Sequence, residues 1–546
     1  MLRRFVYTLI VFPLCASLSA QNESQEEIEM AMRKTNMAIA AIKALYVDSV
    51  DVLDLSDEGI RGMLSSLDPH SAYSTAEETK KLNEPLNGNF EGIGVQFNIL
   101  EDTVLVIQTV SKGPSEKAGI LPGDRIVACN DTVIAGVKMD RADIMKHLRG
   151  DRGTLARLTI KRPGVEGLLS FDVVRDKIPL YTLDASYIIR PGIGYIRISS
   201  FGLTTESELR TALRELKEEG MESLILDLQD NGGGYLQAGT AVASQFLKKG
   251  ELIVYTDGRA VPYQEYRADS GGLFTEGRLV VLVDALSASA AEIVSGAIQD
   301  QDRGVIVGLR TFGKGLVQRP VELPDGSMIR LTVSHYYTPA GRCIQKPYEK
   351  GKASDYVDDL NQRYKEGEMM HQDSVHLVDS LRVTTLKRGR SVYGGGGIMP
   401  DYFVPLDTTK YTSLYRKLSS KNLILQNYMR YADSERNSLK SLYPDFEQFK
   451  ATYEVPQSLT DKILSDGHEA GINPKDDEEL DATLTTLRRV LKGLTARDLW
   501  DMSEYYSIIN EAQTPVQRAL QIISGEEYDR LLQGGSSVVV STEAAE

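Results

Sequence analysis

The stretch that decides the fold is residues 279–293, whose sequence is LVVLVDALSASAAEI. Its apolar residues at 279–283 predict a buried β-strand, and the small residues after them predict the start of a helix. Free backbone N–H groups at such a strand-to-helix junction can stabilise an oxyanion. Ser289 is therefore a candidate nucleophile, although Glu292, three residues later, also fits a helix capping box with no further role.

A second apolar stretch, residues 223–234 (SLILDLQDNGGG), ends in a run of glycines. Glycine lets the backbone approach a ligand closely, and a backbone N–H that donates to an oxyanion needs such an approach. The same residues also suit an ordinary tight turn. The glycines by themselves leave both interpretations open.

Residues 308–315, GLRTFGKG, nearly match the phosphate-binding loop, but Gly315 stands where that loop needs a hydroxyl group for magnesium. A nucleotide site is therefore disfavoured, and Lys314 needs another explanation. A lysine can deprotonate a serine when burial lowers its pKa, and Lys314 lies in an apolar, glycine-lined run that would desolvate it. The histidines, which are the usual alternative bases, are in no recognisable catalytic context: His70, His147, His335, His371, His376 and His468.

Strand-like and helical segments alternate between residues 181 and 406, which is typical of an α/β layer structure. The buried strands expected there are 193–198, 223–228, 279–283, 304–307 and 329–333. The charged segment 348–390 is poor in strand-forming residues and is expected to be an exposed insertion. From residue 408 the sequence is helical to about residue 532, and the polar tail 534–546 is expected to be disordered.

Residues 1–20 have the layout of a secretory signal peptide, with basic residues, an apolar run at 5–14 and then small residues. The apolar run is shorter than the roughly 20 residues that a membrane span needs. The sequence therefore predicts an exported, periplasmic protein, with membrane association as the alternative if this segment is not cleaved. Residues 26–66 follow with apolar side chains at helical spacing.

The composition excludes several classes of protein. The length of 546 residues suggests three or four domains at roughly 100–200 residues each. Lys and Arg number 62 against 77 Asp and Glu, which gives a net charge of −15 and disfavours a nucleic-acid partner. Three cysteines without a CxxC pattern predict neither a disulfide framework nor a zinc site. No metal or other cofactor is expected.

The order of the three motifs is specific: Asn-x-Gly-Gly after one strand, Ser-Ala-Ser-Ala-x-Glu-Ile after the next, then Thr-Phe-Gly-Lys-Gly-x-x-Gln. This order resembles the carboxy-terminal processing proteases, also called tail-specific proteases, which are Ser-Lys peptidases. Segments 331–342, 397–401 and 67–71 also look like that family, so the resemblance extends from about residue 30 to about residue 410. It implies a crotonase-like α/β protease core.

The resemblance also implies a role for each site residue. Ser289 corresponds to the nucleophile, Lys314 to its base, and Gln318 to the residue that orients the lysine amine. The oxyanion donors would be the backbone N–H groups of Ala290 and Gly233.

Two of these assignments stay open. The extra glycine in the turn makes Gly232 and Gly234 alternatives to Gly233 as the donor. Ser287 is the alternative nucleophile, because it is the first serine of the same motif.

Residues 85–168 form a separate β-rich module that looks like a PDZ domain, on the motifs GIGV at 92–95 and AGILPGDRI at 118–126. A glycine-containing loop can offer backbone N–H groups to a terminal carboxylate, and the adjacent strand edge can accept a peptide as an added strand. The residues expected to bind the peptide are Gly92, Ile93, Gly94 and Val95.

The predicted organisation is a signal peptide (1–20), an N-terminal helical segment (21–84), a PDZ domain (85–168), a Ser-Lys protease core (169–407) and a C-terminal helical region (408–546). The predicted function is that of an exported serine endopeptidase that binds unfolded or C-terminally exposed proteins by their C-termini. The C-terminal helices are expected to support homo-oligomers or adaptor contacts. The alternatives are a PDZ-bearing scaffold with an inactive core and a Ser-His hydrolase of small esters.

Overall fold

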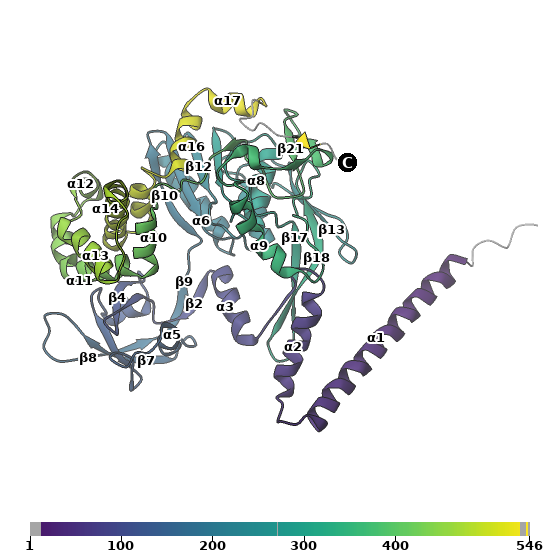
Figure 1. Cartoon of the computed structure of the whole chain (residues 1–546), viewed down its shortest axis with the longest axis horizontal. Helices are drawn as coiled ribbons and strands as arrows, with labels where there is room; N and C mark the ends of the chain where they lie inside the picture. Colours follow the sequence, from purple (N-terminus) through teal and green to yellow (C-terminus); the bar gives the residue numbers. More distant parts are fainter. Residues whose placement is uncertain (1–11, 270, 535–541, 544–546) are drawn as a thin grey trace, which may run out of the picture. The chain divides into compact units, whose positions relative to one another are not determined.

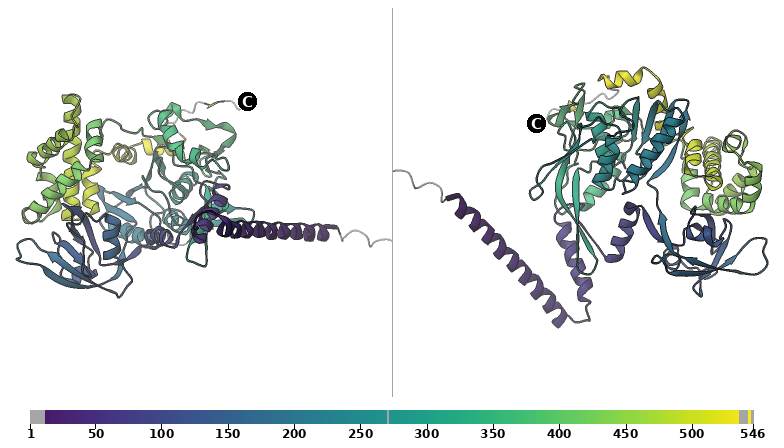
Figure 2. Two further views of the ribbon diagram at one scale, coloured as in Figure 1. Left: turned by 60° about the horizontal axis from the view of Figure 1, so that its bottom comes forward. Right: turned by 180° about the vertical axis from the view of Figure 1, so that it is seen from behind.

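The computed structural model describes residues 12–269, 271–534 and 542–543. They form two compact units. The first unit contains the described part of residues 1–76 together with 320–331 and 348–356, and the second contains the other described residues. Figures 1 and 2 show the elements of both units.

In the first unit, two helices precede a short strand: α1 (Phe12–Leu45), α2 (Val52–Ser65) and β1 (Ala72–Ser74). The single helical stretch expected at 26–66 is therefore broken, because the Asp51 carboxylate accepts the N–H of Leu53 (2.8 Å) and starts a new helix. β1 pairs antiparallel with residues 328–330. Of the expected signal peptide, residues 1–11 lie outside the described residues, and the rest belongs to α1.

The β-rich module of the second unit has one six-stranded antiparallel sheet in the order β3-β4-β5-β7-β8, with β6 beside β5. Strands β2 and β9 pair with each other where the chain enters and leaves the module. The elements are α3 (Ala76–Asn87), β2 (Asn89–Gly92), β3 (Val95–Leu100), β4 (Thr103–Thr109), α4 (Pro114–Ala118), β5 (Arg125–Cys129), β6 (Thr132–Val133), α5 (Arg141–Leu148), β7 (Leu155–Lys161), β8 (Leu169–Val174) and β9 (Asp176–Pro179).

The core sheet of the second unit has the strand order β10-β11-β12-β15-β16-β22, and all its neighbours run parallel except β10 and β11. Its strands are β10 (Leu183–Arg190), β11 (Ile193–Ile198), β12 (Ser223–Asp227), β15 (Leu279–Val283), β16 (Val305–Gly308) and β22 (Tyr402–Phe403). Four of them coincide within one residue with expected strands. β10 was not expected, because its sequence, LDASYIIR, mixes polar and apolar residues and is weak evidence for a buried strand.

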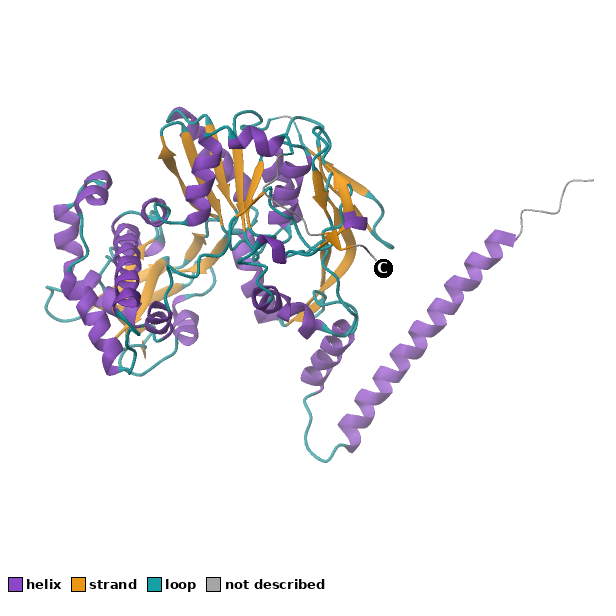
Figure 3. Cartoon of the chain, turned by 45° about the horizontal axis from the view of Figure 1, so that its top comes forward, coloured by secondary structure: helices purple, strands orange, loops and turns teal. Residues whose placement is uncertain are grey.

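Helices cover both faces of this sheet (Figure 3). One face packs against α6 (Thr205–Glu218), α7 (Leu236–Ser244) and α8 (Ala290–Asp300), and the other against α16 (Thr514–Ser524) and α17 (Glu527–Leu532). Alternate residues of β15 serve the two faces: Val281 packs in the first layer and Val280 in the second. The last two helices therefore belong to the core, although they were expected in the C-terminal helical region.

Further strands and short elements surround the core. They are β13 (Leu252–Asp257), β14 (Gln264–Arg267), β17 (Leu316–Glu322), β18 (Met328–Tyr337), α9 (Ala353–Lys365), β19 (Leu377–Val378), β20 (Arg382–Thr384), β21 (Ser391–Tyr393) and β23 (Thr542–Glu543). β23 pairs with β19, so this part of the tail that was expected to be disordered is a strand; most of that tail lies outside the described residues.

The segment 348–390 is not simply an exposed insertion. Arg363 and Glu368 are buried, and Glu368 pairs with both Arg363 (2.8 Å) and Arg310 of the core (2.5 Å). The charged residues Arg363 and Glu368 are buried because they pair with each other and with the core. The composition of the segment does not distinguish such pairs from the charges of a solvated loop.

Six helices form the C-terminal helical region: α10 (Ser413–Ser420), α11 (Leu423–Leu442), α12 (Phe446–Thr452), α13 (Gln457–Glu469), α14 (Asp477–Leu499) and α15 (Met502–Ile509). This region contacts the β-rich module, where Asp433 pairs with Arg125 (2.6 Å), and the core, where the Ser503 hydroxyl accepts the N–H of Ser186 (3.1 Å). Among the described residues, no helix has the length and apolar character needed to cross a membrane.

Candidate active site

Ser289 lies where β15 ends and α8 begins, and it is partly exposed. Its backbone has φ 54° and ψ −111°, a conformation that non-glycine residues adopt rarely and at a cost of about 1–3 kcal/mol. Its N–H donates to Oε2 of Glu292 (2.8 Å). The surrounding structure therefore holds this serine in a strained and defined position.

The Glu292 carboxylate joins the serine to the lysine loop. It is fully buried and accepts four hydrogen bonds: from Thr311 Oγ1 (2.6 Å) and the N–H of Gly313 (2.7 Å) at Oε1, and from the N–H groups of Ser289 (2.8 Å) and Lys314 (2.9 Å) at Oε2. Burial raises the pKa of Glu292 to about 7, and the four hydrogen bonds oppose that rise. One oxygen atom thus positions the backbone of both Ser289 and Lys314.

Lys314 precedes β17, and its amine donates to Oε1 of Gln318 (3.2 Å). The hydroxyl of Tyr336 donates to the carbonyl oxygens of Ser289 (3.1 Å) and Lys314 (2.5 Å). The structure therefore brings Ser289, Lys314 and Gln318 together, and Tyr336 is a second bridge between the serine and the lysine.

Gly233 faces the serine from the end of β12. Its φ is +95°, and a Cβ atom there would lie 2.7 Å from Ser289 Cβ and 3.0 Å from the backbone N of Ala290. Only glycine fits this approach. The Gly233 N–H donates to Oδ1 of Asn231 (2.8 Å), so the expected oxyanion donor already has an acceptor within its own turn.

The alternatives to Gly233 and Ser289 have different surroundings. A Cβ atom on Gly232 would meet nothing, and one on Gly234 would meet the backbone of Phe201 rather than Ser289. Ser287 is fully buried, and its hydroxyl donates to the carbonyl of Leu228 (2.7 Å). These contacts favour Gly233 and Ser289 and give Ser287 a structural role.

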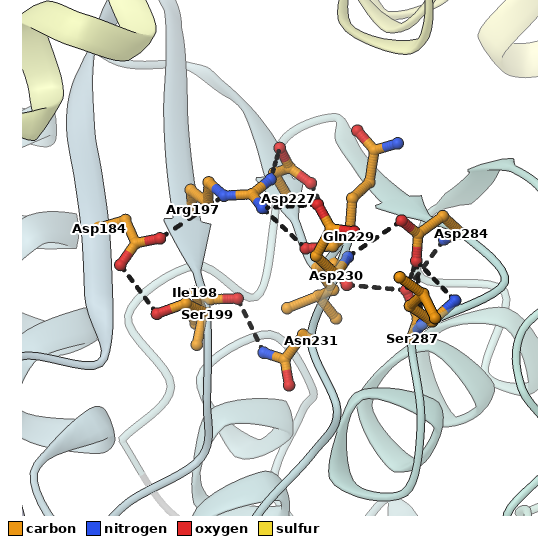
Figure 4. A network of polar contacts seen from close by, with 12 residues as sticks. Asp184, Arg197, Ile198, Ser199, Asp227, Gln229, Asp230, Asn231, Asp284 and Ser287 are labelled. Atoms are coloured by element: carbon orange, nitrogen blue, oxygen red, sulfur yellow. Dashed lines mark hydrogen bonds and ion pairs between the residues drawn. The ribbon is translucent and has the colours of Figure 1, made fainter. Parts of the chain in front are cut away.

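A polar network ties the two loops behind the serine together (Figure 4). Arg197 binds the carboxylate of Asp227 (2.8 Å) and the carbonyl of Gln229 (3.0 Å). Asp284 accepts the N–H groups of Asp230 (3.0 Å) and Ser287 (2.9 Å). The glycine turn and the serine loop are therefore linked through Asp284.

Two charged groups of this network, Asp284 and Arg197, have unusual surroundings. Burial, and then the charge of Asp230, raise the pKa of Asp284 to about 6. The guanidinium of Arg197 also lies over the ring of Tyr506, at 5.1 Å, so α15 of the helical region reaches the network.

His335 has a different environment from the serine. It precedes Tyr336 on β18 and pairs with Asp257 of β13. Because neighbouring strand residues point to opposite sides, its side chain faces away from the side on which Tyr336 contacts Ser289. His70 belongs to the first unit, where its ring bonds to the hydroxyl of Tyr356 (2.9 Å).

Three of the four expected peptide-binding residues line a cavity of about 460 Å3 between β3 and α5. Ile93, Gly94 and Val95 are part of its wall, and Gly94 has φ +74°. Gly92 is not, because it pairs with Asp176 at the end of β2. The cavity therefore has a glycine-containing loop at one end and a strand edge along one side, as a peptide groove needs.

Sequence reasoning missed Tyr336, Thr311 and Arg197, and it gave Glu292 only a capping role. The sequence did contain a sign of the wider role of Glu292, because this residue is a carboxylate among apolar residues, in a helix that the structure shows to be buried throughout. Such a charge requires several donors, so its partners could have been sought in the neighbouring motif.

Four family models match the chain: "Peptidase family S41" at 192–357, "PDZ domain" at 92–173, "Activating protease CtpB N-terminal domain" at 14–79, and a family of unknown function, DUF8443, at 414–501. The last of these lies within the C-terminal helical region.

Curated relatives and solved structures were also found. The carboxy-terminal-processing protease of Bartonella bacilliformis is 33% identical over 63% of this chain and 81% of the relative. The carboxy-terminal processing protease CtpB of Bacillus subtilis is 34% identical over 69% of this chain and 80% of the relative. Among solved structures, a photosystem II D1 C-terminal processing protease is 30% identical over 56% of this chain and 87% of that chain, with a TM-score of 0.31. The chain therefore belongs to the carboxy-terminal processing protease family, and it is a serine protease with a PDZ domain.

Proposed function

We propose that this protease cleaves peptide bonds with a Ser289–Lys314 dyad, after its PDZ domain has bound the C-terminus of the substrate. The observation that carries the dyad is the buried Glu292 carboxylate, whose Oε2 accepts the N–H groups of both residues. A carboxylate that fixes two loops in this way keeps the nucleophile and its base in register.

In the proposed reaction, the neutral amine of Lys314 takes the proton of the Ser289 hydroxyl while the serine oxygen attacks the substrate carbonyl. Gln318 accepts a hydrogen bond from the amine and orients it. The ammonium group then protonates the leaving amine, and the acyl group stays on Ser289. Water, deprotonated by Lys314 in the same way, releases it.

The negative charge of the tetrahedral intermediate would be stabilised by the backbone N–H groups of Ala290 and Gly233. The Gly233 N–H rests on Asn231 Oδ1, so the oxyanion must replace or share that acceptor.

The PDZ domain is proposed to bind the terminal carboxylate at the loop of Ile93, Gly94 and Val95, with the peptide added as a strand to β3. Holding one end of an unfolded chain raises the local concentration of its upstream bonds at the active site. We further propose export to the periplasm, on the signal-like layout of residues 1–20.

The test is to incubate the purified mature protein with an unfolded protein substrate, with and without a metal chelator. Cleavage that survives the chelator and disappears in Ser289→Ala supports the proposal. Carboxylate-dependent peptide binding with no cleavage under any condition would instead support an inactive PDZ scaffold.

A further inference from the structure

The peptide-binding strand β3 is the edge of its sheet, and the two faces of that sheet have different neighbours. On one face, Val95 and Phe97 pack in the core of the module that includes α5. On the other face, Leu105 and Ile107 pack against Met429 of α11 in the helical region. The helical region therefore covers the side of the sheet opposite α5, next to the free edge.

The helical region also reaches the groove itself. Residues 497–502, here named the α14–α15 turn, place Arg497, Asp501 and Met502 in the wall of the 460 Å3 cavity that contains Gly94. The turn is fixed to the sheet because Gln108 of β4 donates to the carbonyl of Arg497 (3.2 Å). The cavity thus has one wall from α5 and one from the α14–α15 turn.

A peptide added to β3 would meet both walls in alternation, because successive side chains of a strand point to opposite faces. Met145 and Leu148 of α5, together with Ile93 of the loop before β3, give this side of the cavity an apolar surface that suits an aliphatic terminal side chain. The penultimate side chain then points toward the α14–α15 turn.

The charges of the cavity favour an acidic side chain at that position. Its wall contains Arg141, Arg149 and Arg497 but one carboxylate, Asp501. Arg141 and Arg149 lie at the two ends of α5, and Arg149 is paired with Glu84 (2.5 Å), so the cation on the side of the α14–α15 turn is Arg497. The Arg497 side chain is about one-third exposed, and its guanidinium binds Asp498 Oδ1 through Nε (2.9 Å) and Nη2 (2.8 Å). Among the described residues its Nη1 has no hydrogen-bond partner, so the two N–H donors of this nitrogen remain for a ligand.

We propose that the α14–α15 turn is part of the peptide-binding site and that Arg497 selects substrates with an acidic residue next to the C-terminal one. This inference rests on the proposed binding of C-termini by the PDZ domain. It gives the region matched by the family of unknown function a role in choosing substrates.

The experiment measures binding of fluorescent peptides to the full chain carrying Ser289→Ala, which prevents cleavage. The peptides end in a free carboxylate and differ only in Glu or Gln at the penultimate or the third-from-last position. We expect Glu to bind about fivefold more tightly than Gln at the penultimate position, near the upper limit for a partly exposed ion pair, with no such preference at the third. Adding Arg497→Gln should remove the preference.

Arg488→Gln is the matched control, since Arg488 lies on the same helix, is exposed and is not in the cavity wall. It should keep the preference. Arg497→Glu should reverse it, so that a penultimate Lys binds more tightly than Glu. A reversal cannot come from misfolding, which would weaken both peptides.

Two results would overturn the inference while leaving the proposed function intact: a Glu preference that Arg497→Gln does not reduce, or no preference at the penultimate position. Equal binding of free-acid and amidated peptides would instead overturn carboxylate recognition by the PDZ domain. The preference could then not be assigned to the penultimate position, because that position is counted from a bound terminal carboxylate.

Discussion

The Glu292 carboxylate and the Arg497 guanidinium are charged groups in the two proposed sites, the active site and the peptide groove, but their surroundings differ. Glu292 is 0% exposed and accepts four hydrogen bonds from two loops. The Arg497 side chain is 31% exposed and pairs with Asp498. The proposed active site is therefore held in place by hydrogen bonds before a substrate arrives. The proposed peptide groove instead leaves N–H donors of Arg497 unpaired among the described residues, and these can bind side chains that vary between substrates.

This difference predicts where substitutions act. Changes around Glu292 should lower kcat, because they displace the reacting groups from each other. Changes in the groove should mainly raise KM, because the groove holds a part of the substrate that does not react.

Apart from substitutions of Ser289 and Lys314 themselves, the largest effect is expected for Glu292→Gln. The amide keeps one acceptor oxygen, but it turns an N–H donor toward two other donors in a buried site, where each unsatisfied group costs about 1–3 kcal/mol. We expect kcat to fall by about a hundredfold or more with KM nearly unchanged, as measured by initial rates on a peptide substrate. A normal kcat would show that the Glu292 carboxylate is not needed to hold Ser289 and Lys314 in position for the reaction.

The next largest effect is expected for Gly233→Ala, because the new Cβ would lie 2.7 Å from Ser289 Cβ at a φ that favours glycine. Loss of one oxyanion donor costs a factor of about 100–1000 in kcat. Gly232→Ala is the matched control, because its Cβ would meet no atom within 4 Å. If both variants retained normal turnover, the oxyanion donor would not be in this turn.

The pH dependence of the free energy of unfolding tests the burial of Glu292 without a substrate. Burial raises the pKa of Glu292 from 4.5 to about 7, so the folded state binds more protons than the unfolded state between these values. Glu292 therefore stabilises the fold fully below pH 4.5, and this contribution, of order 3 kcal/mol, is lost as the pH rises to about 7.

Denaturant unfolding at pH 5 and pH 8 measures this contribution. Wild type should lose more free energy of unfolding than Glu292→Gln, which has no group to titrate at this position. Asp284, whose pKa is raised to about 6, contributes with the same sign in both proteins and does not enter the difference. Identical losses would show that Glu292 is not the titrating group.

The smallest effect is expected in the groove. Amidating the C-terminus of a substrate peptide removes the charge that the loop of Gly94 is proposed to bind, and processing should weaken several-fold through KM. Competition between free-acid and amidated peptides at equal concentration measures the ratio. Equal processing would mean that the protease does not depend on the terminal carboxylate.

The sequence was informative where structure is local. Apolar runs located the strands Ile193–Ile198 and Leu279–Val283 at their observed bounds. The motif order located Ser289, Lys314 and Gln318, whose backbone or side chains lie together in the structure.

What the sequence could not predict depends on contacts between distant segments. Tyr336 reaches the carbonyl of Ser289 from a strand 47 residues away, and no local pattern marks that approach. The charges of 348–390 suggested exposure because a pattern cannot distinguish solvated charges from pairs such as Arg363 and Glu368. Likewise, helical spacing identified α16 as a helix but could not assign it to the core sheet.

The central claim is that Lys314 is the base for Ser289, and Lys314→Arg tests it most directly. Arginine has a similar bulk but stays protonated at any workable pH, so it cannot accept the serine proton. The account predicts a folded protein, with an unchanged melting temperature within a few degrees, and no cleavage that depends on Ser289. More than a trace of Ser289-dependent cleavage by Lys314→Arg would contradict the account, because a group other than Lys314 would then have to be the base.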